Sequence, residues 1–443
     1  MRTVDIGILL KPCIKFDFIG NFTLEGKAVP SENDVCVEAG KLWFNGALYE
    51  SLCFKPQSPD CSFLLHDVVI GVGFHWQRNE DQIFKGELCL IVEEGRVRAI
   101  NRLAVEDYLV SVISSEMSAT SSLEFLKAHT IISRSWLYAQ LDRVSDVTDA
   151  VMGYSDDNEI VRWYAREDHK NFDFCADDHC QRYQGITRSL NPNVARAVEA
   201  TRDVVLKYDG KVCDARFSKC CGGVTERFSA CWEDADYGYL QSFRDSGDGA
   251  PLPDLTTEEG VRAWIETVPV SFCSTNDKVV LSQILNGYDR ETNDFYRWKV
   301  TYSQDELSSL VAGRSGIDFG VIEDLQPVER GASGRIVKLK ITGSKKSVIV
   351  GKELEIRRWL SKSHLYSSAF VVDKEYDSLG NVLFVIKGAG WGHGVGLCQI
   401  GAAMMVKRDI PVNRFSLSTI RARHWKKFDE MWLFGDVCTD KLC

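Results

Sequence analysis

The stretch from Ala104 to Met117, AVEDYLVSVISSEM, indicates how the middle of the chain folds. Its apolar residues at 105, 109, 112, 113 and 117 repeat with the period of an amphipathic helix. Ser121, followed by Glu124 three residues later, then predicts the N-terminal cap of a second and longer helix. The two segments together predict a helical hairpin.

Glu116 stands at the end of the first predicted helix, just before a serine-rich break. A carboxylate that faces Val112, Ile113 and Met117 would lose hydration, which favours its protonated form and suits it to act as a general acid. A solvated glutamate at a helix end would give the same pattern, so both interpretations stay open.

The flanking regions differ from this helical hairpin. Residues 1–100 alternate apolar and polar residues over short runs such as Val4 to Leu9, separated by the turn signals Asn45-Gly46 and Glu94-Gly95. They predict a β-rich N-terminal domain. Residues 101–404 predict a mixed α/β core with an insertion-like segment at about 245–335, so the expected fold class is α+β.

The composition of the chain excludes some classes of function. The 443 residues carry a net charge of −10, which argues against a nucleic-acid partner because the phosphate backbone calls for clustered Lys and Arg. No apolar run approaches the roughly 18 residues of a transmembrane helix. The N-terminus carries no recognisable signal peptide, so we expect either a cytoplasmic chain or an export signal outside this sequence. The 15 cysteines are odd in number and scattered, which favours free thiols plus a metal site over a disulfide scaffold.

Residues 169–180 read HKNFDFCADDHC and hold two thiols and two imidazoles. Zinc binds such ligands, and His169, Cys175 and Cys180 would leave a fourth position open, as in catalytic zinc sites. His179 competes for ligand status, although adjacent residues seldom point into one tetrahedron. Two unrelated surface thiols remain the alternative.

A glycine-rich segment, Gly388 to Gly396, surrounds Trp391 and His393. Its glycines would let the backbone approach a ligand, Trp391 could stack on a sugar, and His393 could hydrogen-bond. A glycine-rich turn with a satisfied histidine explains the pattern equally well.

In this order, these segments resemble the SpoIID/LytB family of peptidoglycan-active proteins. The matching segments are Ala104–Met117, Leu126–Trp136, His169 with Cys175–Gln181, Ser218–Glu226 and Lys387–Ala402. The resemblance implies a SpoIID-type core whose hairpin carries the catalytic glutamate, here Glu116. It also implies zinc bound by His169, Cys175 and Cys180, with four residues between the cysteines where the family usually has five.

The resemblance further implies a lytic transglycosylase that cuts denuded glycan strands between N-acetylmuramic acid and N-acetylglucosamine and forms a 1,6-anhydro product. We expect His393, Trp391 and Gln399 to line the sugar-binding cleft and Arg134 to brace the helix of Glu116 or contact substrate. Hydrolysis would usually need a second carboxylate, for which Glu226 is the candidate.

Two other functions remain open. One is a non-catalytic amidase enhancer or peptidoglycan-binding protein, with a cell-wall amidase as partner. The other is a cytoplasmic scaffold, although the family leads us to expect the cell envelope.

Residues 405–443 do not resemble the family's usual ending. Back-translation of Met405 to Ser416 permits a family-like tail in another frame, which predicts a frameshift near Met405 and makes Cys438 and Cys443 accidental.

Overall fold

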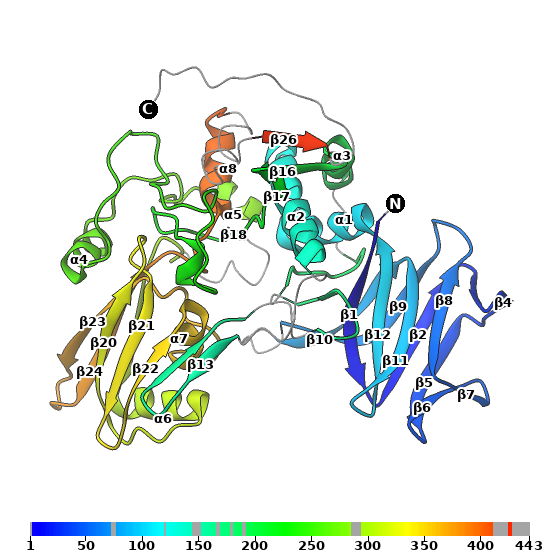
Figure 1. The fold of residues 1–443 in the computed structure, drawn as a ribbon, viewed down its shortest axis with the longest axis horizontal. Coiled ribbons are helices and arrows are strands. Elements are labelled where there is room, and N and C mark those ends of the chain that lie inside the picture. The colour runs from blue at the N-terminus through cyan, green and yellow to red at the C-terminus, as the bar shows by residue number, and fades with distance from the viewer. Residues whose placement is uncertain are drawn as a thin grey trace.

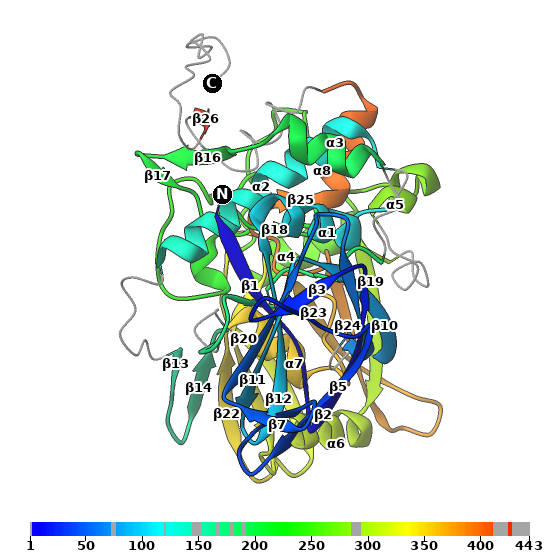
Figure 2. The ribbon, with the colours of Figure 1, turned by 90° about the vertical axis from the view of Figure 1, so that its right-hand side faces the viewer.

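The computed structural model describes residues 2–71, 77–118, 121–143, 152–164, 169–177, 180–187, 192–284, 294–410 and 424–427. Strands and helices are both abundant, as expected for an α+β protein. The strands of the N-terminal part lie on one side of the molecule, a second group of strands lies on the other, and the main helices lie above both (Figure 1). The view in Figure 2, turned by 90°, keeps α1, α2, α3 and α8 at that same end.

Two sheets form the N-terminal domain, as the alternating pattern predicts. The first contains, in spatial order, β15 (Phe174–Cys175), β1 (Thr3–Lys11), β12 (Arg96–Ala104), β11 (Glu87–Glu93), β8 (Ser51–Pro56), β3 (Phe22–Leu24) and β4 (Lys27–Ala28). The second contains β10 (Arg78–Lys85), β9 (Ser62–Ile70), β2 (Cys13–Ile19), β5 (Glu32–Glu38), β6 (Lys41–Phe44) and β7 (Ala47–Tyr49). Phe54 of the first sheet lies 5.3 Å from Phe16 and from Phe18 of the second, so buried aromatic rings join the two.

The predicted turns join antiparallel neighbours. Asn45 and Gly46 connect β6 to β7, and Glu94 and Gly95 connect β11 to β12. In both turns the two central residues have positive φ, which is the backbone form that suits the twist of a hairpin.

Four cysteines of this domain form disulfides, Cys13–Cys36 and Cys53–Cys89, each across a pair of neighbouring strands. The expectation of free thiols was therefore wrong for these four cysteines, whereas Cys61 of the same domain is free. Cysteines on adjacent strands lie opposite one another only once the register is set, so their pairing could not be read from sequence spacing.

The predicted helical hairpin is present as α1 (Val105–Glu116) and α2 (Leu123–Arg143). The chain passes directly from β12 into α1, so the N-terminal sheet fixes where the helix begins. The hydroxyl of Ser122, next to the predicted cap Ser121, accepts a hydrogen bond from the Phe125 N–H at 3.4 Å. Helix α3 (Pro192–Ala200) packs against both.

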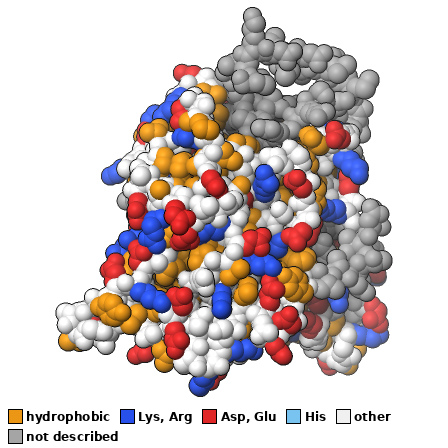
Figure 3. All heavy atoms as spheres, turned by 60° about the vertical axis from the view of Figure 1, so that its left-hand side comes forward, with side chains coloured by type: hydrophobic (Ala, Val, Ile, Leu, Met, Phe, Trp, Pro, Cys, Tyr) orange, Lys and Arg blue, Asp and Glu red, His pale blue; other side chains and the backbone are white. Residues whose placement is uncertain are grey.

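A separate lobe has its own hydrophobic core. Its buried residues all lie in the part of the chain from Trp298 to Ile386. One sheet has the order β13 (Gly153–Ser155), β14 (Glu159–Arg162), β22 (Ser347–Gly351), β21 (Ile336–Gly343) and β20 (Ile322–Arg330), and another has β19 (Arg297–Ser303), β24 (Val382–Ala389) and β23 (Phe370–Tyr376). Helices α6 (Gln304–Ser315) and α7 (Glu353–Trp359) pack on these strands. On the face of the molecule in Figure 3, acidic and basic side chains are interspersed.

The remaining elements surround the helical hairpin and the glycine-rich segment. They are β16 (Val204–Tyr208), β17 (Lys211–Val212), β18 (Phe217–Ser218), the 3-10 helix Phe228–Ala230, α4 (Glu258–Thr267), α5 (Lys278–Ile284), β25 (Leu397–Cys398), α8 (Gln399–Lys407) and β26 (His424–Lys427). Of the atypical tail, Met405 is buried in α8 and β26 pairs with β16, whereas Cys438 and Cys443 lie outside the described residues. None of the described helices has the length and hydropathy of a membrane span.

Candidate functional site

Glu116 is the last residue of α1, and only 9% of its surface is exposed. The same helix buries Val112 and Ile113 completely, so the apolar pattern of the sequence places the carboxylate against the core. Its Oε1 accepts a hydrogen bond from the backbone N–H of Arg182 at 3.4 Å. The side chain is therefore poorly hydrated and held by a neighbouring segment.

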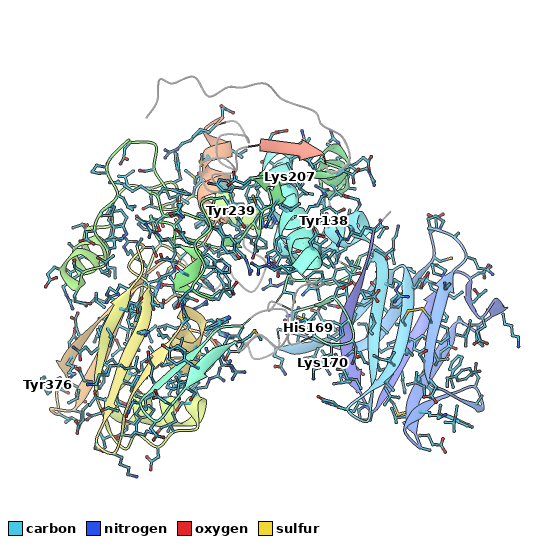
Figure 4. All side chains as sticks on the ribbon, viewed as in Figure 1. Tyr138, His169, Lys170, Lys207, Tyr239 and Tyr376 are labelled. Carbon is cyan, nitrogen blue, oxygen red and sulfur yellow. A yellow bond between two sulfur atoms is a disulfide. The ribbon has the colours of Figure 1, made fainter. Side chains whose placement is uncertain are left out.

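His169, Cys175 and Cys180 meet next to the N-terminal sheet, and we call them the open cluster because each is half-buried. Their ligand atoms all lie within 4.8 Å of one another, and His169 Nε2 lies 3.3 Å from Cys180 Sγ. Figure 4 labels His169 at the junction between the N-terminal strands and the rest of the chain. An imidazole and two thiols at this spacing fit a zinc ion with one further position open. His179 lies outside the described residues.

The first strand of the chain positions this cluster. Strand β15 runs parallel to β1 and pairs Cys175 with Gly7. A Cβ atom at Gly7 would lie 2.6 Å from the ring of Phe172, so only glycine admits this ring. The ring centroid of Phe172 lies 4.8 Å from that of His169, with the two planes tilted. The N-terminal domain thus contributes directly to the geometry of the cluster.

The residues after Cys180 connect the open cluster to α1. The Tyr108 hydroxyl donates a hydrogen bond to Gln181 Oε1 at 3.3 Å, and the next residue, Arg182, binds Glu116. Burial raises the pKa of Tyr108 well above its usual range, and nearby acidic side chains, among them Cys180 and Glu116, add to the shift. Glu116 and the open cluster therefore belong to one site. Beside it lies a cavity of about 180 Å³ lined in part by Cys175, Arg182 and Arg98.

The glycine-rich segment packs against its own protein. The buried guanidinium of Arg335 donates to the Gly392 carbonyl at 2.9 Å, and a Cβ at Gly394 would lie 2.4 Å from Arg335 Cζ. Both glycines also have positive φ. The glycines are thus explained by close internal packing, without any ligand.

Trp391 and His393 project from this segment and are partly buried. Trp391 stacks on Phe295 at 4.8 Å, and His393 meets Trp232 edge to face at 4.9 Å. Burial, together with nearby arginines, lowers the pKa of His393 well below its usual range. Its Nδ1 accepts the Val395 N–H at 3.0 Å, so the neutral ring carries its proton on Nε2 as a donor.

Arg134 and Gln399 occupy interior positions. Arg134 has no exposed surface and forms a two-point ion pair with Glu106 of α1, with Nη2 2.6 Å from Oε2. Gln399 is 1% exposed, and its Nε2 lies 3.0 Å from His129 Nε2. Neither side chain has surface for a direct contact with sugar in this conformation, which corrects the expectation of substrate contacts; Arg134 braces α1 instead.

Glu226, the candidate second acid, is fully buried. Its carboxylate accepts hydrogen bonds from the Ser333 hydroxyl at 2.6 Å and from the backbone N–H groups of Arg227, Ala332 and Ser333. These bonds hold the turn before β21, so Glu226 is not available for a second acid-base role.

The structure also gathers residues that the sequence did not group. Cys221, Asp245, Cys273 and Cys398 are all buried, and their ligand atoms lie within 4.8 Å of one another. We call these four the closed cluster. They come from four distant segments, so no spacing rule could find them; the abundance of cysteine was the only signal in the sequence.

Comparison with known proteins gives two domain matches. Residues 93–208 match the family described as stage II sporulation protein, SpoIID, and residues 226–396 match a domain of unknown function (DUF8618). The SpoIID match covers α1, α2 and the open cluster, and the second match ends within the glycine-rich segment.

Two curated relatives extend these matches. The amidase enhancer of Bacillus subtilis is 26% identical over 313 residues, which cover 66% of this chain and 37% of that protein. Stage II sporulation protein D of Bacillus amyloliquefaciens is 23% identical over 310 residues, 70% of each chain. The chain therefore spans little more than a third of the first relative.

Proposed function

Because the chain belongs to the SpoIID/LytB family, we propose that it is a lytic transglycosylase of peptidoglycan, with Glu116 as its catalytic residue. Its substrate would be denuded glycan strands, cut between N-acetylmuramic acid and N-acetylglucosamine. The observation that carries the proposal is the buried carboxylate of Glu116 beside the open cluster.

The reaction needs one carboxylate in two protonation states. Glu116 in its acid form protonates the glycosidic oxygen, and the bond from that oxygen to C1 of the muramoyl sugar breaks. The carboxylate then takes the proton of the muramoyl C6 hydroxyl, whose oxygen attacks C1 and closes the 1,6-anhydro ring. Glu116 regains its proton, no water is consumed, and no second acid is required.

His169, Cys175 and Cys180 would hold a zinc ion in this proposal. When bound, the ion would cross-link residues 169–180 and so shape the cleft in which the sugar lies. Arg182 then keeps its N–H on Glu116. Trp391 offers a partly exposed aromatic face on which a sugar could stack, and His393 lies two residues further along the same segment.

The test is digestion of denuded glycan strands, with mass spectrometry for 1,6-anhydromuramoyl ends. We expect Glu116→Gln to lower the rate about 10²- to 10⁴-fold, the usual contribution of a general acid. Glu124→Gln is the matched control, because Glu124 is an exposed glutamate of the same helical hairpin. Wild-type protein that forms no anhydro ends, or a Glu116→Gln variant that forms them at the wild-type rate, contradicts the proposal.

The similarity to an amidase enhancer favours a second candidate, a non-catalytic partner of a cell-wall amidase. In that case the chain would accelerate peptide release by an amidase from whole peptidoglycan, and Glu116→Gln would stimulate as well as wild type. A combined assay of anhydro ends and released peptides separates the two functions.

A further inference from the structure

We infer that the closed cluster, Cys221, Asp245, Cys273 and Cys398, is a second metal site that binds a single structural zinc ion. It is separate from the open cluster, which belongs to the proposed glycan site. All four residues are buried, with exposed fractions of 2%, 6%, 1% and 0%. Structural zinc sites are closed in this way, with four protein ligands and no position for water.

The distances within the closed cluster suit a tetrahedron around zinc. Cys221 Sγ lies 3.6 Å from Cys273 Sγ and 3.6 Å from Asp245 Oδ2. Thiolates at the usual zinc–sulfur distance of about 2.3 Å are roughly 3.7 Å apart along a tetrahedral edge. The ligand atoms are thus spaced as a bound ion would hold them.

Asp245 distinguishes this cluster from ordinary buried cysteines. Buried thiols alone behave as small apolar side chains and need no partner. A buried carboxyl group stays ionised only beside a positive charge or several donors, and among the described residues no Lys or Arg forms an ion pair with Asp245. One donor comes from the Cys273 N–H at 3.0 Å. A divalent cation between the carboxylate and the three sulfurs would supply the missing charge.

The surroundings resemble the outer shell of a thiolate-bound metal. The N–H of Cys221 donates to Cys398 Sγ at 3.3 Å, and the N–H of Gly223 donates to Cys221 Sγ at 3.4 Å. Arg335 donates to the Cys221 carbonyl and Arg297 donates to the Gly222 carbonyl. Such N–H donors and nearby guanidinium groups stabilise the negative charge that three thiolates and a carboxylate bring.

Helix α8 is shaped to admit the carboxylate. A Cβ atom at Gly401 would lie 2.6 Å from Asp245 Oδ1, so the helix leaves room for Asp245 only because residue 401 is glycine. The zinc would join this helix to segments near 221, 245 and 273. Between Ala215 and Thr257 the chain has little regular structure, so a metal cross-link explains how its residues stay packed.

The experiment uses the full chain with the open cluster removed by His169→Ala, Cys175→Ser and Cys180→Ser. We expect this variant to retain one zinc ion per chain by elemental analysis and native mass spectrometry. Its zinc X-ray absorption should show three sulfur neighbours at about 2.3 Å and one oxygen at about 2.0 Å.

Variants in the closed cluster complete the test. In the open-cluster variant, Cys273→Ser should remove the remaining zinc, and Asp245→Asn should weaken zinc binding at least about tenfold in competition with a chelator. Cys213→Ser is the matched control, since Cys213 is a buried free cysteine outside the cluster. Retention of zinc by the control supports the assignment.

Four results overturn it. They are an open-cluster variant without zinc, iron in place of zinc, a Cys221–Cys273 disulfide in the native protein, and a zinc with four sulfur neighbours, which would exclude Asp245 as a ligand. Each of these four results is measured on folded protein whose closed-cluster residues are unchanged. None is measured through glycan cleavage, so the test of the second metal site is independent of the proposed function.

Discussion

The two cysteine clusters differ in what surrounds them. The open cluster has three half-buried ligands, lies beside a cavity and is in contact with the segment that binds Glu116. The closed cluster has four buried side chains of the metal-binding type; Cys398 directly precedes α8, and the other three lie in segments with little regular structure. An exposed set of ligands suits a site that substrate must reach, whereas a buried set suits a site that holds the fold together.

Helix α2 lies between the two clusters and links them through side chains. Gln399, next to Cys398, binds His129, and the Ser133 hydroxyl binds the other nitrogen of that ring at 3.3 Å. The Ser133 carbonyl accepts a bond from Gln181, which follows Cys180. Substitutions at each cluster and on α2 can therefore test how the two clusters differ and whether they are linked.

The largest effect on stability is expected at the closed cluster. Cys273→Ser should lower the free energy of unfolding by about 5 kcal/mol or more, because loss of a structural zinc removes much of a domain's stability. Denaturant titration of zinc-loaded protein measures the difference. Equal stability of Cys273→Ser and wild type would mean that the closed cluster does not hold the fold.

The next effect depends on pH and comes from His129. Burial, with a smaller contribution from Lys219, lowers the pKa of His129 to about 3, so below about pH 6.5 the unfolded chain takes up a proton that the folded chain refuses. Stability therefore falls as pH falls, by about 4 to 5 kcal/mol in total between pH 6.5 and 3.

Replacing this histidine tests the link between the clusters. The dependence of the unfolding free energy on pH should be about 1.4 kcal/mol per pH unit shallower in His129→Gln than in wild type between pH 6 and 4. His66 serves as the contrast: partial burial lowers its pKa, but Asp17 and Asp81 outweigh this and raise it. His66→Gln should change the dependence in the opposite sense and only above about pH 6.5, where a histidine of raised pKa titrates. A similar loss of slope between pH 6 and 4 in both variants would refute the assignment.

A third effect concerns the buried ion pair between Arg134 and Glu106, which braces α1. Arg134→Met leaves the Glu106 carboxylate without its partner, which should cost about 3 to 5 kcal/mol of unfolding free energy. The exposed pair of Arg202 and Glu199 provides the control, because Arg202→Met should cost less than about 1 kcal/mol. A cost for Arg134→Met no greater than that of the control would show that the brace is dispensable.

The smallest effect on stability is expected at the open cluster. Cys175→Ser should lower the free energy of unfolding less than Cys273→Ser does, because the side chain is half-buried and its ion would cross-link only one short segment. Glycan cleavage should nevertheless fall about tenfold or more, through loss of zinc. If Cys175→Ser lost stability but cleaved glycan at the full rate, the open cluster would be the one that holds the fold, and not a part of the glycan site.

Local patterns predicted much of this molecule. Alternation and turn pairs predicted the N-terminal sheets, and the apolar period predicted α1 and α2 with Glu116 at the end of a helix. The spacing of His169, Cys175 and Cys180 placed three ligands together because they lie within one short segment.

The rest depends on contacts between distant residues. The ion pair of Arg134 with Glu106, the burial of Gln399 and the four hydrogen bonds to Glu226 arise only when separate segments meet. The closed cluster joins residues up to 177 positions apart in sequence, as between Cys221 and Cys398. A pattern read along the chain contains no information on such distances.

The pairing of β1 with β15 has a practical consequence for dissecting the protein. Cutting the gene near residue 100 would appear to separate two domains cleanly, yet it would remove Gly7, which lies opposite Cys175 and accepts a hydrogen bond from the Ala176 N–H. An isolated "core" would thus lack part of the scaffold that positions Cys175, and its properties would not be those of the same residues in the full chain.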